Sequence, residues 1–334
     1  MAEQPFRWGI LSAANIARRR FVPGVLASDL GKVAAVAARE GDRAQAFAAD
    51  LGIPRAYGSY EELLADSEID GVYIGLPNAL HTEWTVKAAA AGKHVLCEKP
   101  LSRRVSDVEQ MVQACSAAGV LLMEAFMYRH HPQHARVREL LATGEIGEPA
   151  LVHATFTYAM PDARRGLPDV RVQAALDGGA FMDVGCYALN AARYLFDAEP
   201  TEVTALQRSD PQLNVDTGFA AVARFPGDRL ALIDGSFDAA STQRYEVTGF
   251  AGSIVLERAF QPETNPSQII VRSGGEQRIE EIPGADQYGR EADHFVRSVR
   301  AGRLLPPAED GLAQARALEA LYQSAETGRA VRLG

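Results

Sequence analysis

The chain has few cysteines, and their number and spacing exclude several classes of protein. Its 334 residues contain three, Cys97, Cys115 and Cys186, which form neither a disulfide framework nor the spacing of a metal site. A reducing compartment fits this usage best. No apolar run approaches the ~20 residues of a membrane span, and the first residues lack the basic segment of a signal peptide. We therefore expect a cytoplasmic protein without a membrane partner.

An excess of positive charge is lacking too. The chain has 34 Lys and Arg residues against 43 Asp and Glu, a net charge of −9, which disfavours a nucleic-acid partner. The three arginines at 18–20 are better interpreted as the solvated end of a helix, or as a phosphate contact. What remains is a hydrophobic content of 47%, typical of a globular protein, and a length that suits about two domains.

Glycine is missing where a dinucleotide-binding turn would need it. Residues 7–11 predict a strand and residues 13–20 a helix, the setting in which Gly-x-Gly-x-x-Gly places a pyrophosphate on a helix N-terminus. Ser12, Ala14 and Ala17 occupy the three glycine positions. A plain strand-turn-helix and a nucleotide turn that uses Ser12, Ala14, Asn15 and Ile16 both fit these residues.

The residues that follow the second predicted strand, 32–37, indicate which dinucleotide the fold would bind. In NAD-binding folds an acidic residue there binds the ribose 2′-hydroxyl, whereas arginine accommodates the 2′-phosphate of NADP. The strand-end position is Ala38, with Arg39 beside it and Arg43 one helical turn later. This arrangement favours NADP(H), although Glu40 leaves NAD open.

Two further strands end in motifs that carry chemistry. Strand 71–76 leads into Pro77 and Asn78 and then to His81, which is either a site residue or a capping or core histidine. Strand 95–97 runs directly into Glu98 and Lys99, at the strand edge where open α/β sheets bind ligands. A lysine there can polarise a carbonyl group. The alternative is a solvated strand end and a turn at Pro100.

Strands and helices alternate up to about residue 124, which predicts a doubly wound parallel sheet. Beyond it, a helix at 132–143 and two late helices at 290–301 and 309–327 accompany a series of short strands. Several of these strands alternate apolar and polar residues, as expected of an antiparallel sheet with one covered face. The predicted strands are 150–158, 202–207, 218–225, 230–237, 245–249 and 253–257.

Two clusters of polar residues in this second half invite a functional interpretation. His130, His131 and His134 resemble a metal cluster, but Pro132 interrupts the helical spacing and no carboxylate completes a ligand set, so we expect no metal. Asp183 and Tyr187 stand four residues apart on a predicted helix that continues to residue 196, so they share a face. A helix cap and a core tyrosine are the alternative.

In combination, these motifs resemble the Gfo/Idh/MocA oxidoreductase family. The resemblance extends from end to end: the N-terminal turn, Leu76-Pro77-Asn78 with His81, Glu98-Lys99-Pro100, Gly178-Gly179-Ala180 with Asp183 and Tyr187, and residues 245–249. It implies an α/β protein with a Rossmann domain over 1–124. Residues 125–334 would form an α+β domain with a large open, mostly antiparallel sheet for substrate binding and oligomerisation.

Two NADP-linked branches of the family are similar to this sequence. Residues 123–127 and 130–134 resemble the nucleotide-sugar 3-ketoreductases, and residues 169–171 and 183–187 resemble the dihydrodiol and D-xylose dehydrogenases. The resemblance implies an NADP(H)-dependent oxidoreductase that transfers a hydride between nicotinamide and a sugar or sugar-derivative carbonyl or carbinol. A trans-dihydrodiol dehydrogenase-like enzyme and a non-catalytic NADP or sugar sensor are the alternatives.

The resemblance also implies roles for individual residues. Lys99 and Tyr187 would be the catalytic pair, supported by Asp183, and Arg171 and Tyr288 would contact substrate from loops. The Lys99–Pro100 bond would be cis, and the open sheet would form a homodimer or homotetramer. The implied cofactor-binding residues are Ser12, Ala14, Asn15, Ile16, Ala38, Arg39, Arg43, Leu76, Pro77, Asn78, His81, Glu98 and Lys99.

Overall fold

The computed structural model describes residues 4–161, 169–305 and 311–334, which fall into two compact units. The first unit comprises Met1–Ser102, Ser106–His130 and Asp286–Leu312. The second comprises Arg103–Val105, His131–Ala285 and Ala313–Gly334. The sequence placed a single boundary after residue 124, whereas in the structure residues 286–312 return to the first unit.

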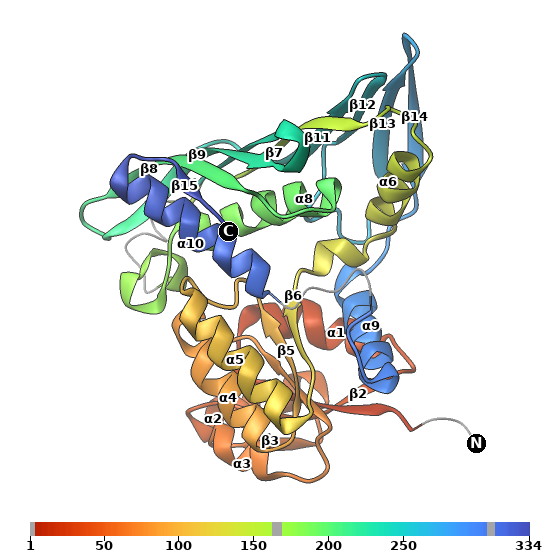
Figure 1. The fold of residues 1–334 in the computed structure, drawn as a ribbon. Coiled ribbons are helices and arrows are strands. Elements are labelled where there is room, and N and C mark those ends of the chain that lie inside the picture. The colour runs from red at the N-terminus through yellow and green to blue at the C-terminus, as the bar shows by residue number, and fades with distance from the viewer. Residues whose placement is uncertain (1–3, 162–168, 306–310) are drawn as a thin grey trace. The chain divides into compact units, whose positions relative to one another are not determined.

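The first unit contains a six-stranded sheet in the order β3-β2-β1-β4-β5-β6, with every neighbouring pair parallel (Figure 1). This is the predicted doubly wound sheet, which is confirmed. Its strands are β1 (Phe6–Leu11), β2 (Gly31–Ala37), β3 (Arg55–Tyr57), β4 (Gly71–Ile74), β5 (His94–Glu98) and β6 (Leu122–Ala125). Its helices are α1 (Val22–Leu26), α2 (Gly41–Leu51), α3 (Tyr60–Ala65), α4 (His81–Ala90), α5 (Val105–Ala118) and α9 (Gln287–Ala301).

Helix α9 belongs to the first unit because its apolar face completes that unit's core. Ala292, Phe295 and Val296 recur at helical spacing and are buried in the same cluster as the aromatic residues of β1. The ring of Phe295 lies 5.3 Å from that of Trp8 and 6.2 Å from that of Phe6. A contact between residues nearly 290 positions apart leaves no local signal, so the sequence pattern predicted the helix but not its unit.

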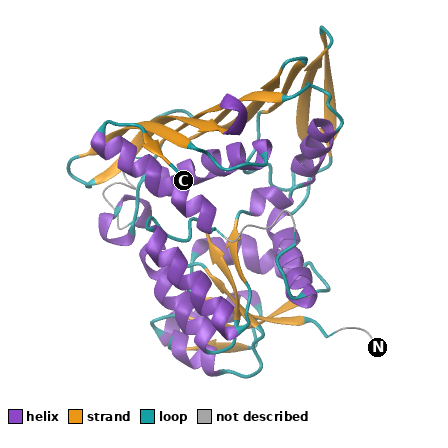
Figure 2. Cartoon of the chain, viewed as in Figure 1, coloured by secondary structure: helices purple, strands orange, loops and turns teal. Residues whose placement is uncertain are grey.

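The second unit is built on a large sheet of strands (Figure 2). It has nine strands in the order β14-β13-β12-β11-β7-β10-β9-β8-β15. All neighbouring pairs are antiparallel except β7 with β10, so the predicted mostly antiparallel sheet is confirmed. The strands are β7 (Pro149–Thr157), β8 (Glu202–Asp210), β9 (Val215–Phe225), β10 (Arg229–Ser236), β11 (Thr242–Gly249), β12 (Gly252–Leu256), β13 (Ser267–Ser273), β14 (Glu276–Ile282) and β15 (Val331–Arg332).

Among the residues that the structure describes, three helices accompany this sheet, and one of them packs on its central strands. They are α6 (Pro132–Ala142), α8 (Cys186–Phe196) and α10 (Leu312–Thr327). Helix α8 packs on β7, β10 and β11. Residues 309 and 310, predicted as the start of the last helix, lie outside the described residues. Within the described ranges, no helix has both the length and the apolar character needed to cross a bilayer.

Candidate active site

The turn after β1 has the backbone of a nucleotide-binding turn although it lacks glycine. Ser12 has φ of +125°, in the region that glycine adopts without a steric penalty, and its N–H donates to the Ala37 carbonyl at 3.1 Å. A helical segment follows at once, because the N–H of Arg18 donates to the Ala14 carbonyl at 3.1 Å and a π-helical turn spans Ala17–Phe21. The sequence therefore adopts the strand, tight turn and helix that a pyrophosphate would require.

Two arginines lie at the carboxyl end of β2. Arg39 follows the buried Ala38, and Arg43 lies in the first turn of α2; both side chains are exposed. Burial raises the pKa of the Tyr60 phenol, and the charges of Arg39 and Arg43 oppose that rise. The two guanidinium groups therefore lie near this phenol. This is the position at which a Rossmann fold holds the ribose 2′-substituent.

His81 holds the loops after β4 and β5 together. Its fully buried ring places Nε2 2.9 Å from the Leu76 carbonyl and Nδ1 3.0 Å from the Pro100 carbonyl. Burial lowers the pKa of His81, so the ring is neutral at pH 7 and donates to one of these carbonyls at a time. Both ring nitrogens therefore face backbone carbonyl groups. Any effect of His81 on a bound nucleotide is then indirect, through the positions of the loops after β4 and β5.

Lys99 lies directly after β5, and two carboxylates hold the loop around it. The Glu98 carboxylate accepts the Tyr73 hydroxyl at 2.6 Å through Oε1 and the Lys99 N–H at 3.3 Å through Oε2. On the other side of the proline, the Leu101 N–H donates to the buried Glu124 at 3.0 Å. The Lys99–Pro100 bond is cis, which confirms that prediction. The half-buried Lys99 therefore emerges from a loop that is fixed on both sides.

Sequence reasoning missed the roles of Tyr73 and Glu124 in this loop. In the sequence Glu124 follows a run of apolar residues, as Glu98 does, and the pairing of Cys97 with Glu124 puts it in β6, the strand next to β5. That repeated pattern of a buried strand ending in a carboxylate is the signal that would have found it. Tyr73 gives no such signal, because an aromatic residue in a buried strand is expected of any core.

In the second unit, the segment that carries Asp183 and Tyr187 is held at its start by a buried carboxylate. Asp216 accepts the Phe181 N–H at 2.6 Å and the Tyr322 hydroxyl at 3.1 Å. Gly179 has φ of +128°, and a Cβ there would lie 2.2 Å from an oxygen of Asp216. Only glycine allows the chain to pass this close to the carboxylate that begins the helix.

Asp183 lies in a π-helical turn, Phe181–Gly185, that runs into α8, where Tyr187 is the second residue. Single π-helical turns inside helices are frequent at functional sites. The Tyr187 ring is 4% exposed, with ring centres of Phe156 and Phe260 at 5.4 and 5.5 Å. Beside it, the Cys186 carbonyl accepts the amide of Gln314 at 2.9 Å. Helix α10 therefore fixes the backbone next to Tyr187.

Asp183 is the centre of a polar cluster in the second unit. The Tyr158 hydroxyl donates to Oδ2 of Asp183 at 2.8 Å, and Nε of Arg171 lies 3.2 Å from the same oxygen. Nη1 of Arg171 is 3.3 Å from a carboxylate oxygen of Asp169. Burial and the charge of Asp183 raise the pKa of Tyr158 far above its ordinary value, so this phenol remains a donor. The sequence predicted Arg171 and Asp183 but not Tyr158.

The second substrate candidate, Tyr288, is not in a loop as predicted. Helix α9 begins at Gln287, and Tyr288 is a buried residue of its first turn in the first unit. Its N–H donates to Asp286, the helix N-cap, at 3.0 Å. The error arose because the Asp286 cap was not recognised, which placed the start of the helix three residues too late.

The histidines at 130–134 have structural partners. His131 caps α6 by accepting the Gln133 N–H, and His134 lies between the Ala259 carbonyl at 2.8 Å and the Tyr245 hydroxyl at 3.0 Å. The ring of His130 packs on that of His294. Among the described residues, no three His, Cys, Asp or Glu side chains are grouped so that they could hold a metal ion.

Comparisons with known proteins agree with this architecture. Residues 6–126 match the oxidoreductase family model with an NAD-binding Rossmann fold, and residues 134–255 match the GFO/IDH/MocA C-terminal domain. The chain is 41% identical to D-xylose 1-dehydrogenase (NADP(+)) 2 of Haloferax volcanii, over 98% of this chain and 99% of that protein. It is 31% identical to trans-1,2-dihydrobenzene-1,2-diol dehydrogenase of Xenopus tropicalis, over 83% and 81%.

A solved structure is similar over nearly the whole chain. The 3-ketoreductase of Actinomadura kijaniata, in complex with NADP and TDP-benzene, has a TM-score of 0.89 and 33% identity, covering 96% of this chain and 98% of that one. Both branches expected from the sequence therefore appear among the relatives. With its Rossmann unit, its open second sheet and these matches, the chain belongs to the Gfo/Idh/MocA family of oxidoreductases.

Proposed function

We propose that the protein is an NADP(H)-dependent oxidoreductase that acts on a carbonyl or carbinol carbon of a sugar or sugar derivative. The observation that carries the proposal is the position of Lys99, a half-buried ammonium group at the carboxyl end of β5 in a loop fixed by Glu98 and Glu124. Relatives whose names state sugar or diol oxidoreduction support the substrate class.

The turn after β1 and the end of β2 are the proposed nucleotide site. Ser12, Ala14, Asn15 and Ile16 would hold the pyrophosphate. The exposed guanidinium groups of Arg39 and Arg43 would pair with the 2′-phosphate, which supports NADP over NAD. The loops after β4 and β5 would line the nicotinamide end through Leu76, Pro77, Asn78 and Glu98. The bound cofactor supplies or accepts a hydride at its nicotinamide ring.

The proposed chemistry divides between two side chains. In reduction, Tyr187 gives its phenolic proton to the carbonyl oxygen, and Lys99 stabilises the negative charge that develops there. The carbonyl carbon gains the hydride, so that C=O, NADPH and H⁺ yield CH–OH and NADP⁺.

Single substitutions test these roles. Replacing Lys99 by Ala should reduce kcat by several powers of ten, whereas NADPH, measured by its fluorescence, should still bind. Tyr187→Phe should also reduce kcat more than it weakens cofactor binding. Lys32→Ala, at an exposed lysine of β2, is the matched control and should be indistinguishable from wild type. Near-normal turnover by Lys99→Ala would refute the assignment.

A substrate panel separates the alternatives. Aldopyranoses, nucleotide-linked keto sugars and vicinal diols would be offered with NADPH or NADP⁺, in parallel with NADH or NAD⁺. Turnover of diols alone would favour a dihydrodiol dehydrogenase-like enzyme. Binding of NADPH without turnover of any compound would favour the sensor. We further propose that the enzyme is cytoplasmic and forms a homodimer or homotetramer through the open face of its nine-stranded sheet.

A further inference from the structure

Four residues after Lys99, the chain reaches the helix that also fixes the start of the segment leading to Tyr187. The residue at this point is Arg103, where the chain passes from the first unit to the second. We propose that Arg103 is a positioning residue for Tyr187. It acts through two side chains, Tyr322 of α10 and Asp216 of β9. This inference rests on the proposed function, which makes Tyr187 the proton donor.

Three contacts anchor the short segment that begins at Arg103 on one face of α10. Nη2 of Arg103 donates to the Glu326 carboxylate at 2.6 Å, and the guanidinium carbon lies 3.9 Å from the centre of the Tyr322 ring. The Val105 N–H donates to the Glu319 carboxylate at 3.1 Å. The three residues of α10 are spaced by three and four positions, so they share a face of the helix. The segment therefore has a fixed place on α10.

The stack on Tyr322 is the contact through which Arg103 acts. The pair with Glu326 adds little, since the two side chains are 38% and 54% exposed. Tyr322 is only 4% exposed, and the flat guanidinium group lies over the face of its ring. A planar cation stacked on an aromatic face restricts the plane of the ring. Arg103 therefore fixes the direction in which the Tyr322 hydroxyl points.

That hydroxyl is joined to the start of the Tyr187 segment by one carboxylate. The Tyr322 hydroxyl donates to Oδ1 of Asp216 at 3.1 Å, and Oδ2 of Asp216 accepts the Phe181 N–H at 2.6 Å. The rings of Tyr322 and Phe181 also pack together, with their centres 4.9 Å apart. The two oxygens belong to one rigid group, so a rotation of the phenol moves the acceptor of the Phe181 N–H.

The charge of Arg103 supports the same link. Burial raises the pKa of Asp216, whereas its bonds with Phe181 and Tyr322 and the charge of Arg103 oppose that rise. Arg103 thus favours the ionised carboxylate, which is the stronger acceptor for a backbone N–H and suits the start of a helix. Burial and the charge of Asp216 raise the pKa of Tyr322 well above its ordinary value, so the phenol remains a donor.

The segment between Phe181 and Tyr187 is packed too closely to absorb a displacement. A Cβ on Gly179 would lie 2.2 Å from Oδ1 of Asp216. The Phe219 ring stacks on Phe181 at 4.0 Å, and a Cβ on the next glycine, Gly185, would lie 2.7 Å from that ring. Close-packed interiors transmit small shifts. A shift at Phe181 therefore reaches Tyr187, which lies six residues further along the same helical segment.

The kinetic test uses Arg103→Met in the full-length protein, with the compound of the substrate panel that wild type turns over fastest. A misplaced proton donor should lower kcat about tenfold or more. KM for the compound and Kd for NADPH, measured by its fluorescence, should stay within about twofold of wild type. A role in stability alone would leave kcat of the folded enzyme unchanged. Arg103→Lys keeps a cation over the Tyr322 ring and should recover most of the loss.

Tyr322→Phe tests the route, because it keeps the ring under Arg103 and removes the hydroxyl that reaches Asp216. It should lower kcat as Arg103→Met does, and the double variant should be no worse than the more affected single variant by more than about twofold. Arg329→Met is the control for loss of an arginine: Arg329 is exposed and follows α10, and its substitution should leave kcat at the wild-type value.

Hydrogen exchange of the free protein gives a readout that needs no substrate. In Arg103→Met and Tyr322→Phe the Phe181 amide should exchange about tenfold faster, whereas the amides of β2 should not change. Turnover by Arg103→Met within about twofold of wild type, additive effects in the double variant, or an unchanged Phe181 amide would each overturn the inference and leave the proposed oxidoreductase intact. If wild type turns over no compound of the panel, the proposed function fails instead. Exchange of the Phe181 amide then decides whether Arg103 holds the start of the helical segment.

Discussion

At the scale of single residues, Ser12 is the position where the sequence departs most from what its backbone conformation requires. Its φ of +125° lies in a region that side chains rarely occupy, and the residue is buried at the end of β1. A strained residue of this kind costs of order 1–3 kcal/mol and persists only where the surrounding structure holds it, often at a ligand site. The conformation is retained here although the glycine that would relieve it is absent.

Ser12→Gly should therefore stabilise the protein. Relief of the strain, less the greater backbone entropy of glycine in the unfolded chain, predicts a gain of about 1 kcal/mol in the free energy of unfolding. Urea denaturation measures this difference. Ala13→Gly is the matched control, because Ala13 does not have a positive φ, and it should lose about 0.5–1 kcal/mol. A Ser12→Gly variant less stable than wild type would show that the turn is not strained.

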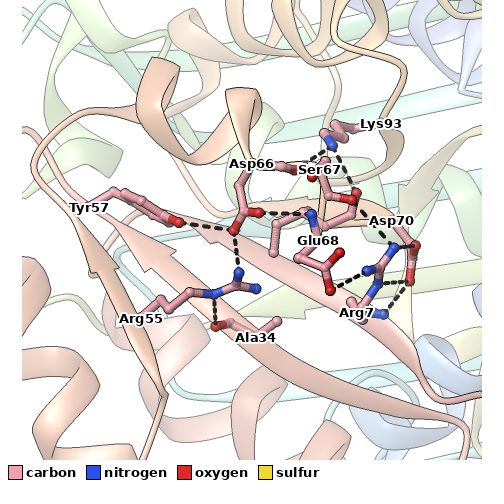
Figure 3. Close-up of polar contacts among 10 residues, drawn as sticks. Arg7, Ala34, Arg55, Tyr57, Asp66, Ser67, Glu68, Asp70 and Lys93 are labelled. Atoms are coloured by element: carbon pink, nitrogen blue, oxygen red, sulfur yellow. Dashed lines mark hydrogen bonds and ion pairs between the residues drawn. The ribbon is translucent and has the colours of Figure 1, made fainter.

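At the scale of secondary-structure elements, a cluster of charged residues ties the starts of three parallel strands together (Figure 3). Arg7 in β1 donates to Asp70, which precedes β4, through its backbone N–H at 2.7 Å, Nε at 3.1 Å and Nη2 at 2.7 Å. Lys93, which precedes β5, donates to the carbonyls of Asp66 and Ile69 at 2.7 and 2.9 Å. These contacts lie at the amino ends of the strands, opposite the edge that carries Lys99.

The Arg7–Asp70 pair gives stability a defined dependence on pH. Burial acts to raise the pKa of Asp70, but the hydrogen bonds and charge of Arg7 outweigh it, so the pKa lies below its ordinary value of 3.8. An acid whose pKa is lowered by folding adds stability that is complete above the unfolded pKa and is lost as pH falls through the folded value. The contribution should therefore be constant from about pH 5 upward, begin to fall near pH 4, and be lost only as the pH passes below the folded pKa of Asp70.

Asp70→Asn tests this expectation. The variant should be less stable than wild type by about 1–3 kcal/mol at pH 7, and the difference should shrink as the pH is lowered from 4 to 3. Urea unfolding at several pH values measures both quantities. Glu68→Gln is the comparison, since Glu68 also pairs with Arg7 but its side chain is 64% exposed, and its effect should be smaller. A deficit that stayed constant down to pH 3 would contradict the assignment.

Local patterns predicted most elements because each strand or helix leaves its own mark in the sequence. The strand that ends at Glu98 and the helix that contains Tyr187 were both predicted in this way. The cis bond before Pro100 was predicted from the family resemblance instead. The hairpin β13–β14 was missed although Gly274 and Gly275, both with positive φ, form a turn typical of two-residue hairpins. Its second strand is mostly exposed and charged, so it lacks the apolar alternation that marks a strand.

The supporting residues of the candidate site were harder to predict for a different physical reason. Asp216 holds the helix entry before Asp183 from 35 positions away, and Tyr158 reaches Asp183 across 25. Such contacts depend on strand order and register, and one sequence gives neither. The residues that belong to a motif could therefore be predicted from the sequence, and the residues that orient them could not.

At the scale of the whole molecule, the outer face of the nine-stranded sheet is more apolar than a solvated surface needs to be. Four side chains form what we call the outer-face patch: Leu151 of β7, Leu206 of β8, Val222 of β9 and Leu232 of β10. Val222 pairs directly with Leu232, and Leu151 pairs with Leu230. The four side chains lie on one face of four neighbouring strands, and exposed apolar surface of this kind is typical of an interface.

The outer-face patch should therefore be covered by a second copy of the chain. Leu206 is 71% exposed and Leu232 is 41% exposed, and burying both against a symmetry-related sheet would remove two of the three leucine side chains of the patch from water. Leu232→Glu places a charge at the centre of this face, where burial without a partner costs several kcal/mol. Light scattering should then give the mass of a dimer or tetramer for wild type and of a monomer for the variant.

Phe250→Glu is the control: Phe250 is 99% exposed between β11 and β12, outside the patch, so its substitution should leave the oligomer intact. A wild-type protein that is monomeric at micromolar concentration would refute the interface, and dissociation by Phe250→Glu but not by Leu232→Glu would place it elsewhere on the second unit.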